Sequence, residues 1–401
     1  MIGRGISRSG LAIVAIGFVV LFVSGGSRHA IGLVLKPMAD TFDWERSTLG
    51  AAIALFLFVS ALCMFFAGHL ADRISLRTIL GGGLFVSAIG IGLMSLVSEP
   101  WHAFLFYGVA FAIGNGIASV PPICAMVARQ FPDNAGMANS IAISGMGLGQ
   151  LLIIAVLAAV LVGDGWRSVF IWLGAINLLL VPFVLWAVSR SDTATGNATA
   201  PIAGPLIRDA LRTQHFWILL AVYALCGFQD FFASTHVVAF ALDRDMPALF
   251  AGNLLAFMGL AGLVGVIAAG TWSDRFSPVS ATVICFIIRT AIFAMILISK
   301  DQIAVTAFAI LFGFTYWITA PLTVVFVRNA FGVRNLGALS GLITMVHHMC
   351  GGIGAWTGAV MFDTDGSYDT PFMIMLGCSL TAILLSFGLL AAPRLGGSQR
   401  I

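Results

Sequence analysis

Several ionisable side chains lie inside long apolar stretches, where they could bind a charged substrate or carry a proton. Arg28 and Asp230 stand 202 positions apart, one a cation and the other an anion. His347 and His348 are adjacent in a third apolar stretch, and Arg289 lies in a fourth. A charge at membrane depth costs about 2.5–3.5 kcal/mol on insertion scales, so such residues usually mark a pathway for ions or substrates.

These residue types predict a particular chemistry. We expect Arg28 to bind an anionic substrate while Asp230 pairs with it or carries a proton, with a static ion pair as the alternative. A histidine titrates near physiological pH, which suits a proton carrier, although a packing histidine is equally consistent with the sequence. Arg289 is either a structural tie to a neighbouring helix or a substrate contact. The weaker polar and aromatic candidates for the same pocket are His29, Asn115, Gln150, Gln229, Tyr316 and Trp317.

The elements that must hold these side chains are membrane-spanning helices. The chain is 60% hydrophobic and 9% charged, whereas soluble domains carry about 25% charged residues. So much apolar surface requires a lipid solvent, and the expected partner of the chain is the bilayer. Breaks at Gly, Pro and charged residues predict twelve spans, near 11–36, 47–71, 78–98, 101–128, 135–162, 167–188, 216–241, 248–272, 279–299, 303–327, 336–361 and 371–392.

Two loops carry nearly the same motif and indicate an internal duplication. The first Asp-Arg loop (68–77) and the second (270–277) both read G-x-x-[AS]-D-R-x-S and are 202 positions apart. A second set of residues agrees, because Gly114, Pro122 and Arg129 are separated by the same distances along the chain as Gly313, Pro321 and Arg328. Many secondary transporters are duplicated in this way, with the substrate bound between the repeats. We therefore predict an N-terminal half (1–188), a flexible linker (189–213) and a C-terminal half (214–401).

The distribution of basic residues predicts the orientation in the membrane. With the N-terminus inside, thirteen of the 20 Lys and Arg residues fall in inner segments, five in outer loops and two within spans. This bias follows the positive-inside rule, so both termini and both Asp-Arg loops are expected in the cytoplasm. The first apolar run is too long for a signal peptide and is interpreted as the first span.

Other classes of function have little support in the sequence. All six cysteines fall inside apolar segments with no C-x-x-C spacing, which suits packing residues and predicts neither disulfides nor a metal site. The basic residues form no stripe for nucleic acid. No nucleotide-binding loop is present, so no cofactor is expected and energy should come from an ion gradient.

The Asp-Arg loops resemble the signature loop of the major facilitator superfamily, which that family carries between spans 2 and 3 and repeats between spans 8 and 9. The resemblance implies an all-α membrane fold of twelve helices in two pseudo-symmetric six-helix halves. It also implies a conformational gate, because the loop acid pairs with arginines and helix ends in the outward-facing state. The gate residues would be Asp72, Arg73, Arg77, Asp274 and Arg275.

A finer resemblance is to the bacterial branch near the monocarboxylate and oxalate–formate transporters. It is carried by residues 28–32 leading to Pro37, by Trp44-Glu45-Arg46-Ser47, and by His348 with the glycines that follow it. The resemblance implies a small organic anion moved with a proton across a bacterial cytoplasmic membrane. It also favours His348 over its neighbour as the substrate contact or proton carrier. The chain departs from the pattern at Val266, where relatives commonly carry a substrate-binding arginine.

The sequence therefore predicts a secondary transporter and no enzyme activity. We expect it to move a mono- or dicarboxylate with a proton, by alternating access and as a functional monomer. Proton-driven efflux of a hydrophobic or cationic compound, with Asp230 as the substrate contact, is the alternative within transport. It is weakened because span 5 lacks the Gly-Pro signature of drug–proton antiporters. A membrane-embedded sensor or enzyme is a third possibility, but no clustered nucleophile or metal ligands support it.

Overall fold

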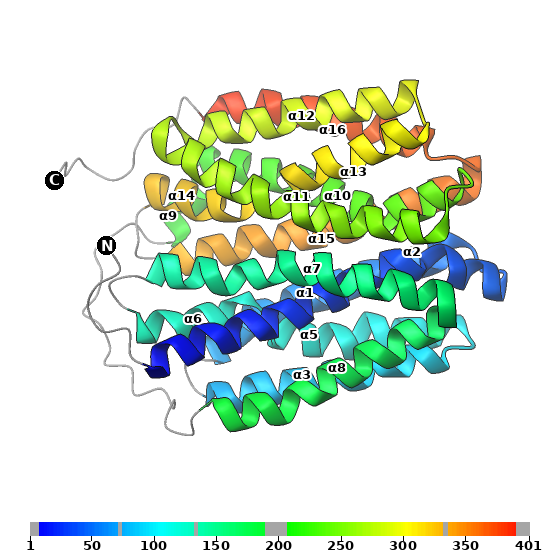
Figure 1. The fold of residues 1–401 in the computed structure, drawn as a ribbon. Helices are drawn as coiled ribbons and strands as arrows, with labels where there is room; N and C mark the ends of the chain where they lie inside the picture. The colour runs from blue at the N-terminus through cyan, green and yellow to red at the C-terminus, as the bar shows by residue number, and fades with distance from the viewer. Residues whose placement is uncertain (1–7, 71–73, 132–134, 189–206, 332–335, 390–401) are drawn as a thin grey trace. The chain divides into compact units, whose positions relative to one another are not determined.

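The protein is helical throughout the part of the chain that the structure describes. The computed structural model describes residues 8–70, 74–131, 135–188, 207–331 and 336–389, and every regular element in these ranges is a helix (Figure 1). Within them, ten helical segments are long and apolar enough to cross a membrane, and Gln302–Tyr316 is a shorter apolar helix. The predicted all-α membrane class is confirmed, because apolar stretches of this length can satisfy their backbone in lipid only as helices.

The chain divides into two compact units. The first comprises Met1–Trp44 and Leu55–Gly196, and the second comprises Glu45–Ala54 and Asn197–Ile401. Helix α2 (Arg46–Leu70) contributes its first turns to the second unit and the rest to the first. The other helices of the first unit are α1 (Arg8–Phe42), α3 (Leu76–Leu93), η1 (Met94–Leu96), α4 (Pro100–Ala103), η2 (Phe104–Phe111), α5 (Ala112–Ile117), α6 (Val120–Gln130), α7 (Ala135–Asp164) and α8 (Trp166–Ala187).

The second unit is also built only of helices in its described residues. They are α9 (Ile207–Leu211), α10 (Gln214–Leu242), α11 (Ala248–Arg275), α12 (Pro278–Ile298), α13 (Gln302–Tyr316), α14 (Thr319–Phe331), α15 (Leu336–Asp365) and α16 (Asp369–Gly388). The boundary predicted between the halves, 189–213, falls largely on residues outside the described ranges.

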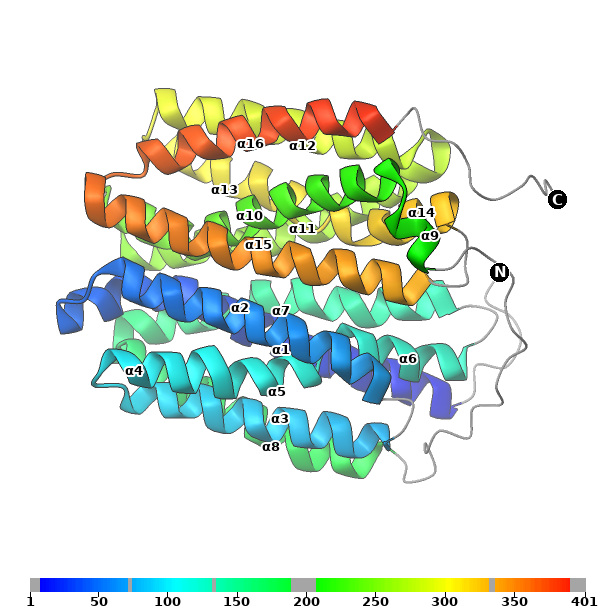
Figure 2. The ribbon, with the colours of Figure 1, turned by 180° about the vertical axis from the view of Figure 1, so that it is seen from behind.

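The two units pack their helices in the same order. In the first unit α1 pairs with α7 and α3 pairs with α8. In the second, α10 pairs with α15 and α12 pairs with α16, and each pair runs side by side in both views (Figure 2). These four pairs match spans 1 and 5, 3 and 6, 7 and 11, and 9 and 12 of the duplicated pattern. The helix pairing therefore supports the duplication inferred from the loops.

Small residues let the paired helices approach closely. A methyl group on Gly149 of α7 would overlap the backbone carbonyl of Phe22 in α1, and one on Gly354 of α15 would overlap that of Phe228 in α10. Helices in lipid gain little from apolar burial against one another, so close backbone packing at glycine is a main source of their association.

Two predicted spans are interrupted, and the breaks are related by the repeat. The span predicted at 101–128 breaks between Ile117 and Val120, and the span predicted at 303–327 breaks between Tyr316 and Thr319. Adding 199, the spacing of the second repeated set, to 117 and 120 gives 316 and 319. Prolines follow each break, and proline removes a backbone donor while favouring the first turn of a new helix. Each of these two predicted spans is therefore built from more than one helix.

Candidate functional site

A buried ion pair joins α10 to α12 in the second unit. Asp230 Oδ1 lies 2.5 Å from Arg289 Nη2, and the two side chains are 2% and 0% exposed. Taking both charges out of water is costly, and their attraction offsets the cost only when the remaining donors are also satisfied. Within this unit Asp230 pairs with Arg289, which ties α12 to α10. The pairing of Asp230 with Arg28 that the sequence predicts stays a prediction.

Every donor of the Arg289 guanidinium has an acceptor within the unit. Nε donates to Thr315 Oγ1 at 3.0 Å, and Nη2 donates to the Thr315 carbonyl at 3.2 Å as well as to Asp230. Nη1 donates to Gln229 Oε1 at 3.2 Å and to Cys226 Sγ at 3.5 Å. A guanidinium has five N–H donors, so none is left for a substrate in this arrangement. In this arrangement Arg289 thus holds Asp230 in place with all of its donors used within the unit.

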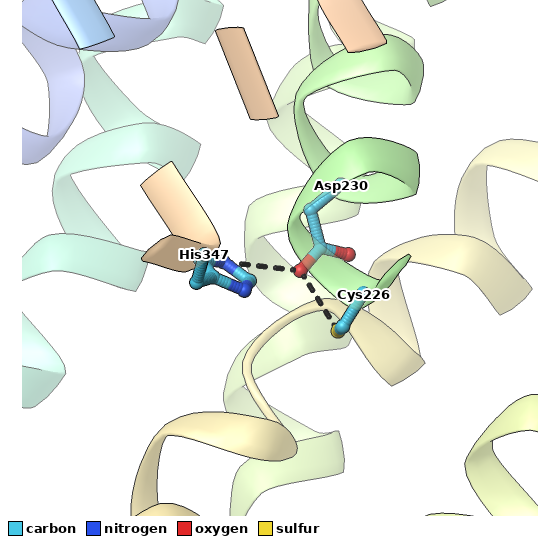
Figure 3. A group of neighbouring side chains, drawn as sticks. All are labelled: Cys226, Asp230 and His347. Atoms are coloured by element: carbon cyan, nitrogen blue, oxygen red, sulfur yellow. Dashed lines mark hydrogen bonds and ion pairs between the residues drawn. The ribbon is translucent and has the colours of Figure 1, made fainter. Parts of the chain in front are cut away.

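The second oxygen of Asp230 faces a cysteine and a histidine (Figure 3). Cys226 Sγ lies 3.3 Å from Oδ2, one helical turn away on α10. His347, on α15, places Nε2 3.6 Å from the same oxygen, and its Nδ1 lies 3.1 Å from the Tyr223 carbonyl. The carboxylate is therefore bracketed, with Arg289 on Oδ1 and His347 on Oδ2. The pairing of α10 with α15 creates this arrangement.

The same three groups could in principle ligate a metal ion. The ligand atoms of Cys226, Asp230 and His347 lie within 4.8 Å of one another, and thiolate, carboxylate and imidazole are the usual ligands of zinc. Arg289, however, already donates to both the carboxylate and the sulfur. A divalent cation at this point would be repelled by that fixed positive charge, so we assign no metal here.

The two adjacent histidines of α15 have different surroundings. His348, the residue favoured from the sequence, is 8% exposed and places Nδ1 2.9 Å from the Thr344 carbonyl of its own helix. Its ring packs against Phe231. It is His347, not His348, that lies beside Asp230. Successive helical residues point about 100° apart, so only the packing of α15 on α10 decides which one meets the carboxylate.

The remaining candidates of the second unit are buried or half-buried, and their predicted roles stay predictions. Gln229 donates to the Met375 carbonyl at 2.8 Å and to Ser379 Oγ at 2.7 Å, so it joins α10 to α16 while accepting from Arg289. Tyr316 is buried at the end of α13, and its ring lies 5.1 Å from that of Trp317.

In the first unit, Arg28 lies on α1 and is half-buried. Tyr107, from η2, donates from its hydroxyl to the Arg28 carbonyl at 3.2 Å. His29 is buried, with Nδ1 2.7 Å from the Gly25 carbonyl of its own helix. A neighbouring helix thus holds the backbone of this turn of α1. Of the two ionisable residues Arg28 and His29, Arg28 has the more exposed surface.

The two polar candidates on the neighbouring helices of this unit are buried. Asn115 of α5 donates from Nδ2 to Ser24 Oγ of α1 at 2.9 Å. Gln150 of α7 is fully buried. The substrate-binding roles that the sequence predicts for Asn115 and Gln150 stay predictions.

The predicted gate is only partly within the described residues. Asp72 and Arg73 lie outside the described ranges, as does the side chain of Asp274. Arg77 is half-buried in the first turn of α3, and Arg275 is exposed at the last residue of α11. The gate therefore stays a prediction.

A second charged cluster, which the sequence did not indicate, lies at the start of α2 among residues of the second unit. Arg46 forms two parallel hydrogen bonds to Asp243, Nη1–Oδ2 at 2.6 Å and Nη2–Oδ1 at 2.7 Å. Its guanidinium also stacks 3.7 Å from the centre of the Phe362 ring and donates to Tyr368 Oη at 2.8 Å. Burial raises the pKa of the Tyr368 hydroxyl, which therefore keeps its proton and can donate it to His236 Nδ1, 3.1 Å away.

The first turn of α2 is also capped by an acid from α15. Asp363 accepts from the backbone N–H groups of Arg46 at 3.0 Å and Ser47 at 2.7 Å. A carboxylate at a helix N-terminus satisfies donors that the helix cannot, and it favours the positive end of the helix dipole. The sequence shows the Trp44–Ser47 motif but not the contacts that it makes, because the acids that meet it are 197 and more positions away.

Comparison with known proteins agrees with this architecture. Residues 17–355 match the Major Facilitator Superfamily model. Similar proteins include an uncharacterized MFS-type transporter of Bacillus subtilis, 24% identical over 88% of each chain. Mouse monocarboxylate transporter 11 is also 24% identical, over 96% of this chain and 88% of its own.

Solved structures with the same fold are transporters as well. A bacterial homologue of the lysosomal transporter Spinster, in an inward-facing conformation, superposes with a TM-score of 0.78 over 98% of this chain and 100% of its own, at 15% identity. The nucleoside transporter NupG gives a TM-score of 0.74 over 96% of this chain and 100% of its own, at 13% identity. Because the family match covers most of its length, this chain belongs to the major facilitator superfamily and is an integral membrane transporter.

Proposed function

We propose that this transporter moves a small organic anion, a mono- or dicarboxylate, together with a proton by alternating access. Relatives named as monocarboxylate transporters support the substrate class. In this proposal the protein works as a monomer in a bacterial cytoplasmic membrane with both termini inside. The basic residues that the sequence places in inner segments support that orientation.

The observation that carries the proposal is the buried Asp230–Arg289 pair with His347 at its edge. A charge pair at 2% and 0% exposure within apolar helices is costly, and a pair of apolar residues would hold α10 to α12 as well. Adding a titratable imidazole 3.6 Å from the carboxylate makes the cluster able to change its charge by one proton. Such a cluster suits a proton-coupled carrier better than a purely structural tie.

The anion also needs a cation that can bind it. Val266 occupies the position of the arginine that relatives commonly use, and Arg289 has all its donors engaged by the protein. In the first unit Arg28, a half-buried residue of α1, is the proposed anion contact. Arginine suits a carboxylate because its planar fork can donate two parallel hydrogen bonds.

The alternative, efflux of a cationic compound bound to Asp230, has less physical support. A cationic substrate would have to share the carboxylate with Arg289, whose Nη2 lies 2.5 Å from Oδ1. Releasing Arg289 would leave a fully buried guanidinium without its counter-charge, which typically costs about 3–5 kcal/mol. The binding energy of the substrate would have to offset this loss.

Uptake into proteoliposomes tests the proposal. The purified protein is reconstituted, and uptake of labelled acetate, lactate and succinate is measured with an acidic exterior and with equal pH on both sides. We expect at least one carboxylate to accumulate above its external concentration only when the exterior is acidic. If no carboxylate enters, while a drug cation is extruded under a pH gradient, the cation-efflux alternative replaces the proposal.

A further inference from the structure

We propose that His347 carries the proton that is coupled to anion transport, while Asp230 stays ionised as a fixed counter-charge. The inference rests on the proposed function and names the residue of that site that changes its charge. Asp230 itself and His348 were the carriers predicted from the sequence, so the proposal differs from that prediction at both positions.

The hydrogen bonds of His347 determine where its proton can bind. A carbonyl oxygen only accepts, so the 3.1 Å contact with the Tyr223 carbonyl requires that Nδ1 carries a hydrogen. In the neutral ring Nε2 is then a lone pair, and it faces Asp230 Oδ2, another acceptor, at 3.6 Å. Two acceptors facing each other repel. A proton on Nε2 turns this contact into an attraction between an imidazolium and a carboxylate.

Arg289 decides which side of that contact holds the proton. Its guanidinium lies 2.5 Å from Oδ1 and is held by four further hydrogen bonds, so it cannot swing away from the carboxylate. A positive charge this close favours the ionised form of an acid. Protonating Asp230 would leave Arg289 buried without its counter-charge, whereas protonating His347 preserves the pair and adds a second cation to it.

Access favours the same residue. The His347 side chain is 15% exposed, whereas Asp230 is 2% and Arg289 is 0% exposed. The imidazole is therefore more accessible to a proton than the carboxylate is. The Phe231 ring from α10 and the His348 ring from α15 lie beside the imidazole. Further out, Cys226 of α10 and Arg289 of α12 contact Asp230, uncharged Thr319 of α14 contacts Cys226, and Ser379 of α16 contacts Gln229.

One proton and one substrate anion then bind and leave together in a simple cycle. A proton from the acidic side binds Nε2 of His347, and the cluster of Asp230, Arg289 and His347 changes its net charge from zero to plus one. That added charge attracts the carboxylate of the substrate, and substrate binding in turn stabilises the proton. No covalent bond forms or breaks. On the other side the proton leaves Nε2, the extra charge is lost and the anion departs with it.

Paired substitutions of the two histidines test the assignment. His347→Gln and His348→Gln are compared in proteoliposomes, with accumulation driven by a pH gradient and with counterflow exchange at equal pH. We expect His347→Gln to reduce accumulation to the level without a gradient while some exchange persists, which also shows that the variant is folded. We expect His348→Gln to accumulate substrate. The variant His347→Lys, with a permanent charge, should exchange substrate but not accumulate it.

Substrate binding at different pH gives a second readout. For the natural chain, binding linked to one proton weakens by up to about tenfold for each unit of rising pH, and in His347→Gln this dependence should disappear. Accumulation by His347→Gln, or its loss only in His348→Gln, would overturn the assignment.

A spectroscopic arm separates failure of this proposal from failure of the proposed function. NMR of the purified protein with isotope-labelled histidine detects protonation of His347 without any transport, using His347→Gln to identify its signal. If the natural chain carries no carboxylate, the proposed function fails, whatever the histidine does. If carboxylate is accumulated while the signal of His347 never reports a protonated ring between pH 5 and pH 8, the proton carrier is another residue.

Discussion

Gly227 of α10 lies directly opposite the backbone carbonyl of His347 in α15, with no room for a methyl group between them. Gly227 is three residues before Asp230, so this close approach is what brings the imidazole to the carboxylate. The first unit repeats it, because Gly25, 202 positions earlier, lies against the backbone of Met146 in α7.

Gly227→Ala should therefore separate α10 from α15. The added methyl overlaps the His347 carbonyl, and overpacking of this kind costs about 1–3 kcal/mol. We expect a lower unfolding temperature in detergent and loss of proton-driven accumulation. Gly341→Ala, on the partner helix α15 and with open space around it, is the control and should leave both unchanged or slightly raise stability. Equal behaviour of the two variants would contradict the packing argument.

Breaking the buried pair from one side should be more harmful than removing both charges. Arg289→Gln leaves Asp230 without its counter-charge at 2% exposure, which we expect to cost about 3–5 kcal/mol. The double variant Asp230→Asn, Arg289→Gln should recover part of this loss, because no uncompensated charge remains. Thermal unfolding of the two single variants and the double variant gives the coupling between the residues. Simple additivity of the two single effects would show that the pair contributes no coupling.

Arg28→Ala should abolish carboxylate uptake without unfolding the first unit. The hydrogen bond that holds this turn of α1 runs from Tyr107 to the Arg28 backbone carbonyl, so it survives loss of the side chain. Arg28→Lys should retain only part of the uptake, since a point charge does not reproduce the bidentate fork. Uptake in proteoliposomes and the unfolding temperature are the measurements. Normal uptake by the alanine variant would remove Arg28 from the anion site.

Arg46→Ala should destabilise the second unit by about 2 kcal/mol. The substitution removes both hydrogen bonds to Asp243 and leaves its carboxylate unpaired. Because this side chain is 18% exposed, water can solvate part of the charge and lower the usual cost of an unpaired buried charge. Arg46→Lys should recover only a fraction, because it keeps the charge but not the stacking on Phe362. Arg244→Ala removes an exposed neighbouring charge, and we expect its unfolding temperature to match that of the natural chain.

The class of the protein and its repeated plan were determined by the sequence alone. Apolar stretches near 20 residues long can only be helices in lipid, and the Asp-Arg loops repeat at a fixed spacing, so both properties are local and can be counted along the chain. Asp230 and Arg289 could also be singled out, because a charge inside an apolar span is visible without any neighbour.

Only the tertiary structure decided which of these residues meet. Asp230 and Arg289 are 59 positions apart on different helices, and their contact depends on how α10 and α12 pack and rotate against each other. The same holds for His347 over His348, where a rotation of about 100° exchanges the two rings. Close glycine contacts such as Gly227 against α15 set that rotation, and their effect appears only when two distant segments are placed together.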